Sequence, residues 1–108
     1  MDFSELWTTV ERRLQPGQRV RNWTAAKGFL VDDFTVVRID TSNVWIDAPN
    51  AETIQRVSRK DFEVMFDHWT GYCSGQVKRS DLVKLTRVSK YTMSILRHLD
   101  VQTPVRTG

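Results

Sequence analysis

The sequence predicts an α+β fold: an N-terminal helix, a sheet of three or four antiparallel strands arranged as a meander or half-barrel, and a C-terminal trihelical unit packed on it. Three observations predict this order. Apolar residues recur at helical spacing at the start of the chain, β-branched and aromatic residues gather in short runs across residues 18–57, and helical spacing returns across residues 58–100. A chain of 108 residues suits one hydrophobic core, so we expect a single domain over residues 1–102 and a frayed tail over residues 103–108.

The first helix has a start signal, an apolar stripe and a stop signal. Asp2 stands three residues before Glu5, the spacing of a capping box, in which the two side chains bond the free amides at a helix start. Pro16 and Gly17 end the helix, because both residues are unfavourable in a helix interior. The stripe that we expect to face the core consists of Phe3, Trp7, Val10 and Leu14.

Turn-forming residues divide the sheet region into strands. Residues 40–43 read Asp-Thr-Ser-Asn, and these short polar side chains bond the nearby backbone in turns, which predicts a hairpin. Lys27 and Gly28 break the chain after the first strand. Residues 48–51 form a second predicted turn, before a strand over residues 52–57.

A second capping-box spacing opens the next helix. Ser58 precedes Asp61 by three residues, and Gly75 follows the last apolar position as a C-terminal stop. We expect this helix to pack on the sheet, with Cys73 as a small core residue. Its predicted apolar stripe consists of Phe62, Met65, Phe66, Trp69 and Cys73.

Several functional classes lack support in the sequence. No apolar run is long enough to span a bilayer, and the acidic start does not resemble a secretion signal, so we expect a cytoplasmic protein without a membrane partner. Neither His68 nor His98 has partners at metal-ligand spacing, so we expect neither a metal nor a cofactor. An enzyme would need a histidine to meet an acidic residue across space. Acidic residues that flank strands are usually solvated, so we expect that the protein is not an enzyme. The acidic residues of this kind are Asp32, Asp33, Asp40 and Asp47.

Charge is distributed unevenly along the chain. Residues 1–74 contain nine Lys or Arg against eleven Asp or Glu, whereas residues 75–108 contain seven against two. This asymmetry favours a polyanionic partner for the C-terminal third. The alternative is a basic face that only keeps the protein soluble.

Residues 80–99 resemble a helix-turn-helix motif. Leu82 and Val83 match the first apolar pair of the motif, Val88 and Ser89 match the residues that leave its turn, and residues 92–94 match the following trio. Leu96 takes the next inward position. We expect Ser80 to cap the first helix and Ser89 to cap the second. The turn position that is usually glycine is Arg87, which would cost about 1–2 kcal/mol in a left-handed conformation.

The resemblance implies that apolar residues clamp two helices so that one face of the second projects outward, toward duplex DNA. Residues expected to contact bases or nearby phosphates are Ser89, Lys90, Tyr91, Ser94, Arg97 and His98. Residues expected to reach flanking phosphates are Lys78, Arg79 and Lys84. The alternative is that the two helices only close a core, and burial of Tyr91 and Ser94 would then exclude a reading helix.

A second, looser resemblance is carried by residues spread over the C-terminal half. These are Ile54, Asp61-Phe62-Glu63, Trp69, Tyr72, Gly75, Arg79-Ser80, Leu82, Thr86-Arg87, Ser89-Lys90-Tyr91, Ser94-Ile95-Leu96 and Leu99. The pattern resembles small uncharacterised bacterial proteins encoded by mobile integron gene cassettes. This resemblance implies a bacterial cytoplasmic protein without catalytic residues, and it implies core positions for Trp69, Tyr72, Tyr91 and Leu96.

Two other functions remain open from the sequence. An adaptor domain would self-associate as a homodimer through aromatic residues on the sheet, where alternation could leave Trp23 or Trp45 exposed. A small-ligand binder would use a cavity lined by tryptophan, since the chain has four.

Overall fold

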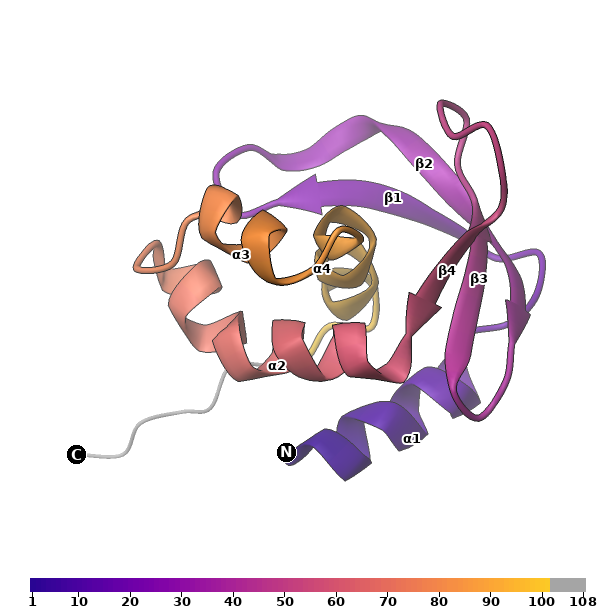
Figure 1. Ribbon diagram of the computed structural model, residues 1–108, viewed down its shortest axis with the longest axis horizontal. Coiled ribbons are helices and arrows are strands. Elements are labelled where there is room, and N and C mark those ends of the chain that lie inside the picture. The colour runs from indigo at the N-terminus through magenta and orange to yellow at the C-terminus, as the bar shows by residue number, and fades with distance from the viewer. Residues whose placement is uncertain (102–108) are drawn as a thin grey trace.

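The computed structural model describes residues 1–101 (Figure 1), and the tail expected over residues 103–108 lies outside them, as does the domain boundary at residue 102. The predicted α+β order is confirmed: one helix, four strands and three helices follow one another along the chain. The elements are α1 (Phe3–Arg13), β1 (Arg19–Thr24), β2 (Gly28–Ile39), β3 (Asn43–Asp47), β4 (Gln55–Ser58), α2 (Arg59–Ser74), α3 (Arg79–Leu85) and α4 (Ser89–His98).

Both predicted capping boxes are present. The Asp2 carboxylate accepts the backbone N–H of Glu5 at 2.9 Å, and the Ser58 hydroxyl accepts that of Asp61 at 3.1 Å. In each case the acidic residue also accepts the backbone N–H of its partner. Gly75 ends α2 in the left-handed conformation, with φ of 85°, a conformation that glycine adopts without steric cost.

The four strands form an open antiparallel meander in the order β1-β2-β3-β4. The pairing of β1 with β2 shifts register between Arg21 and Trp23, and that of β2 with β3 shifts between Val36 and Arg38. Such irregularities bend a strand and increase its twist. The sheet accordingly curves over α4 instead of lying flat (Figure 1).

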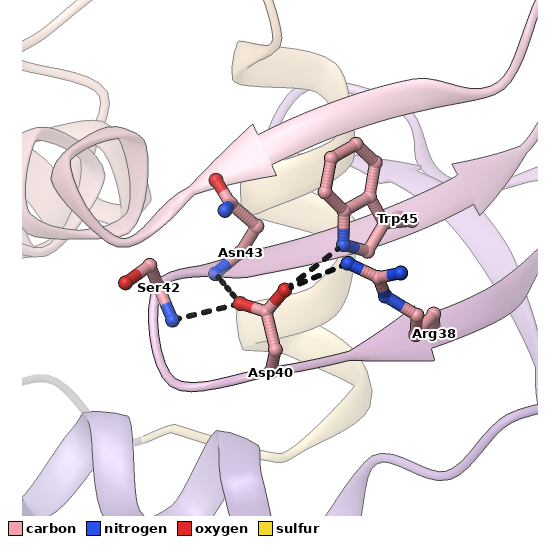
Figure 2. Close-up of polar contacts among 5 residues, drawn as sticks. All are labelled: Arg38, Asp40, Ser42, Asn43 and Trp45. Atoms are coloured by element: carbon pink, nitrogen blue, oxygen red, sulfur yellow. Dashed lines mark hydrogen bonds and ion pairs between the residues drawn. The ribbon is translucent and has the colours of Figure 1, made fainter.

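The predicted turn at residues 40–43 is organised by one carboxylate (Figure 2). Asp40 accepts the backbone N–H groups of Ser42 at 2.9 Å and Asn43 at 2.8 Å. Its second oxygen accepts the Arg38 guanidinium at 3.1 Å and the Trp45 indole N–H at 3.3 Å. The hydrogen bond from Ser42 is the largest of the effects that lower the pKa of Asp40 to about 2, against the opposing effect of partial burial.

The helix α4 lies at the centre of the molecule, with the sheet curving over one side and α2 beneath it (Figure 1). Met93, Ile95 and Leu96 are completely buried there, although their side chains point in three different directions around the helix axis. The core also takes residues from α1, all four strands, α2 and α3. The last helix of the described chain therefore lies in the core, packed chiefly against β1 and α2.

The predicted core position of Cys73 is wrong, because its side chain is exposed. The inward stripe of α2 runs through Phe62, Met65, Trp69 and Tyr72, so the helix buries the residue three positions after Trp69, not the residue four positions after it. Cys73 lies about 100° further round the helix from Tyr72. Within residues 1–101, no helix has the length and apolar character that crossing a membrane requires.

Candidate nucleic-acid interface

The segment that resembles a helix-turn-helix does form two helices, but their ends differ from the predicted ones. The residues at the N-caps are Lys78 for α3 and Val88 for α4, whereas Ser80 and Ser89 lie inside the first turns. Among the non-glycine residues of the described chain, only Asp100 has a positive φ. The residue at the usual glycine position, Arg87, therefore avoids the left-handed conformation, and the turn differs from that of the motif.

A carboxylate from α2 anchors this turn. Asp61 accepts the Thr86 hydroxyl at 2.8 Å through one oxygen. Its other oxygen accepts the backbone N–H and the hydroxyl of Ser58, at 2.9 and 2.8 Å. Asp61, which completes the capping box of α2, thus also fixes the chain between α3 and α4.

Three of the residues expected to contact DNA are buried, and for them the prediction is wrong. Ser89 is 2% exposed, Tyr91 is 6% exposed and Ser94 is 1% exposed. The Tyr91 ring packs edge-on against Phe34 of the sheet, with 5.2 Å between ring centroids. By the criterion stated from the sequence, the face that carries these side chains cannot read base edges.

Short hydroxyl side chains explain why the prediction placed this face in solvent. The Ser94 hydroxyl donates to the Lys90 carbonyl at 2.7 Å, and the Thr92 hydroxyl donates to the Ser89 carbonyl at 3.0 Å. A serine or threonine that bonds its own helix in this way is satisfied without water. Polar composition therefore did not imply exposure here.

Two further residues expected to contact DNA have other roles. The His98 ring lies half-buried with its Nε2 atom 2.8 Å from the Gln18 amide nitrogen, and burial, followed by the charge of Arg13, lowers its pKa below 6.5. His98 is therefore mostly uncharged at neutral pH. Arg97 is exposed but forms a salt bridge of 3.2 Å with Asp100.

The remaining expected residues lie on the surface. Lys78, Arg79, Lys84 and Lys90 are exposed, and so is Arg87, which the motif comparison had treated only as a turn residue. Within residues 1–101, none of these five side chains has a carboxylate within 4.0 Å; the ion pairs found there involve other cations. This set of unpaired cations is called the 78–90 cations below.

A cavity of about 530 Å³ lies beside two of the 78–90 cations. It is bounded by the β1–β2 turn, the end of α2 and the start of α3, and all its charged lining residues are basic: Lys27, Lys78 and Arg79. Lys27 was not among the predicted site residues, because 51 positions separate it from Lys78 and only the fold places both on one cavity. No local pattern could have indicated this pairing.

A second cavity, of about 130 Å³, lies next to the first. The two share Thr24, Leu30 and Arg79, and the second extends to Lys90 and includes one acidic residue, Asp32. The two neighbouring cavities are together called the hairpin furrow below, and the cations that line them are Lys27, Lys78, Arg79 and Lys90.

The sequence also raised a tryptophan-lined cavity, a role for His68 and a metal site. A cavity of about 280 Å³ is lined by Trp23 and Trp69, whereas no tryptophan lines the 530 Å³ cavity. His68 contacts the Val64 carbonyl of its own helix at 2.9 Å. In the part of the chain that the structure describes, no group of three or more His, Cys, Asp or Glu side chains could hold a metal ion.

In comparisons with known proteins, no family model, no curated protein and no solved structure matches the chain.

Proposed function

We propose that the protein is a non-catalytic cytoplasmic domain that binds nucleic acid through its phosphates, without a base-reading helix. The observation that carries this proposal is the set of 78–90 cations, which are exposed and have no carboxylate partner within the described residues. Lysine and arginine side chains that lack an acidic partner attract phosphates. When they bind a nucleic acid, the counterions condensed on its phosphates are released.

The choice of phosphates over bases follows from the position of α4. Its central position leaves Lys90 and Arg97 at the surface, while the side chains between them are buried. Contacts to phosphate position a protein on nucleic acid but carry no sequence information. The proposed binding is therefore independent of sequence.

The test is a fluorescence anisotropy titration with labelled random-sequence oligonucleotides at two salt concentrations. If four phosphates are neutralised, the Kd should rise about 100-fold between roughly 50 and 200 mM salt. Binding that is absent, or that does not weaken with salt, would end the proposal.

A charge-reversal pair tests the location. Arg79→Glu combined with Lys90→Glu should abolish binding, since both side chains line the hairpin furrow, and should leave the circular dichroism spectrum unchanged because both are exposed. The matched control is Arg12→Glu combined with Arg56→Glu, which changes the net charge equally on exposed positions of α1 and β4. Equal losses in the two pairs would show that net charge alone drives the binding.

A second candidate function, self-association, rests on the outer face of the sheet. Val37 is 42% exposed and Ile54 is 48% exposed, and with Trp45 and Arg38 they line a shallow depression of about 200 Å³. The Arg38 guanidinium lies 4.9 Å from the Trp45 ring centroid. Exposed apolar residues that cluster in this way suit a contact with a second copy of the chain.

Light scattering at micromolar concentration tests this second function. A homodimer that Val37→Lys and Ile54→Lys together convert to a monomer would support it. A strictly monomeric unmodified protein at that concentration would remove it.

A further inference from the structure

The cavity of about 530 Å³ has walls suited to an uncharged ring. Ala25, Ala26, Leu30 and Val77 contribute apolar side chains, with the Tyr72 side chain beside them. Its volume falls within the range of about 300–1,000 Å³ that is typical of pockets for small organic ligands. One nucleotide belongs to that size class.

The charges around the cavity suit the other part of a nucleotide. Its charged lining residues are Lys27, Lys78 and Arg79, all of them cations. Arg79 lines both cavities of the hairpin furrow, and Lys90 lines the smaller one. Further cations therefore lie beside the 530 Å³ cavity. An apolar pocket with cations along its approach is complementary to a base with phosphates on either side of it.

We propose that the hairpin furrow binds single-stranded nucleic acid, with one unpaired base in the 530 Å³ cavity and the adjoining phosphates at Lys78, Arg79 and Lys90. This inference rests on the proposed function and names its substrate class. A base in a duplex is paired and stacked, and entering a pocket would cost the loss of both interactions, whereas a base in a single strand can turn outward at little cost.

The sole cysteine of the chain provides a probe of the cavity. Cys73 lines this cavity as well as the 280 Å³ cavity of Trp23 and Trp69, and it is exposed, so a thiol reagent can reach it. A base that fills the cavity should slow the alkylation of Cys73, while phosphates bound only at Lys84 or Arg87 should not. Cys73→Ser serves as the control for labelling elsewhere in the protein.

The experiment compares four probes: a single-stranded oligonucleotide, an abasic strand of the same length, the corresponding duplex and a nucleoside monophosphate. The single strand should bind at least about tenfold more tightly than the abasic strand, as contacts to one base provide. At a concentration about ten times its Kd, it alone should slow Cys73 alkylation about tenfold. Protein alkylated beforehand with a bulky maleimide should bind the single strand only as weakly as the abasic strand.

The outcomes separate this inference from the proposed function. Equal, salt-dependent affinity for the single strand, the abasic strand and the duplex would overturn the cavity proposal and leave phosphate binding intact. Absence of binding to all strands would remove both. Protection of Cys73 by the monophosphate as strong as that by the single strand would show that the cavity takes free nucleotides, which would also overturn the proposal for a strand.

Discussion

The hydroxyl oxygen of Ser94 lies 3.0 Å from the backbone nitrogen of Trp23 and accepts its N–H. This hydrogen bond joins α4 to the edge strand β1 across 71 sequence positions. The Tyr72 hydroxyl accepts the N–H of Ala25, just beyond the same strand, also at 3.0 Å. Outer strands carry backbone N–H groups that lack a strand partner. Two helix side chains supply acceptors for N–H groups of β1 and of the turn that follows it, and one of them, Ser94, is a residue that the sequence had placed against DNA.

Replacing Ser94 with alanine should destabilise the protein. The substitution leaves the N–H of Trp23 without its acceptor, which should lower the free energy of unfolding by about 1–2 kcal/mol. Urea denaturation measures this change. Ser80→Ala is the control, because Ser80 is exposed in α3, and a similar loss in both variants would contradict the structural role of Ser94.

Asp61 should couple α2 to the turn before α4. Because its carboxylate accepts three hydrogen bonds, Asp61→Asn should lower the free energy of unfolding by about 1–3 kcal/mol. A double-mutant cycle with Thr86→Val should give a coupling energy of about 1 kcal/mol. The exposed Asp67, on the same helix, provides the control Asp67→Asn. Additive effects of the Asp61 and Thr86 substitutions would contradict this coupling.

A side chain at position 71 should destabilise the protein. A Cβ atom at this position would lie 2.6 Å from a methyl carbon of Val77, closer than two carbon atoms can approach without a shift. Although alanine favours helices more than glycine, Gly71→Ala should cost about 1–3 kcal/mol in the free energy of unfolding through overpacking. Val77→Ala in the same chain removes the clashing methyl group and should recover part of the loss. A stabilising Gly71→Ala would show that Val77 moves aside freely.

The turn around Asp40 should stabilise the fold in a defined pH window. Its folded pKa of about 2 lies below the ordinary value of 3.8, so the unfolded chain binds more protons between these values. The contribution of Asp40 is therefore complete above pH 3.8 and is lost as the pH falls through about 2. Denaturation at a series of pH values should show the difference between the unmodified protein and Asp40→Asn shrinking over this window. A difference of the same size at every pH would contradict it.

His98 should titrate below its ordinary pKa of 6.5, since burial disfavours its charged form and Arg13 repels it. The unfolded chain then binds the proton more readily, so this residue should reduce stability as the pH falls below 6.5. An NMR titration of the His98 ring measures the midpoint directly. A midpoint at or above 6.5 would return His98 to the set of cations available for phosphate.

Local chemistry accounts for the features that the sequence predicted well. The capping boxes at Asp2 and Ser58, the turn at residues 40–43 and the stop at Gly75 each depend on side chains within a few positions of one another. The hydrogen bonds that define them join residues two or three positions apart. Such signals set where helices and strands begin and end.

The surroundings of α4 could not be predicted in the same way. The helix-turn-helix resemblance implied that one face of the helix projects into solvent, but Ser94 satisfies its hydroxyl within the fold and Tyr91 packs on the sheet. Which elements enclose a helix depends on contacts between segments far apart in sequence. The same holds for the 530 Å³ cavity. Lys27 and Lys78 line it together only after β1, β2 and α3 have packed.

The enclosed position of α4 has a consequence for synthesis of the protein. The strands that curve over this helix end at Ser58, whereas the helix itself ends at His98, so a ribosome adds about 40 residues between them. At a translation rate of about 5–20 residues per second, roughly 2–8 s pass between synthesis of the last strand and synthesis of the end of α4. During that interval Phe34, whose ring packs against Tyr91 of α4, lacks this cover, and a chain whose translation stalls there would be a target for chaperones.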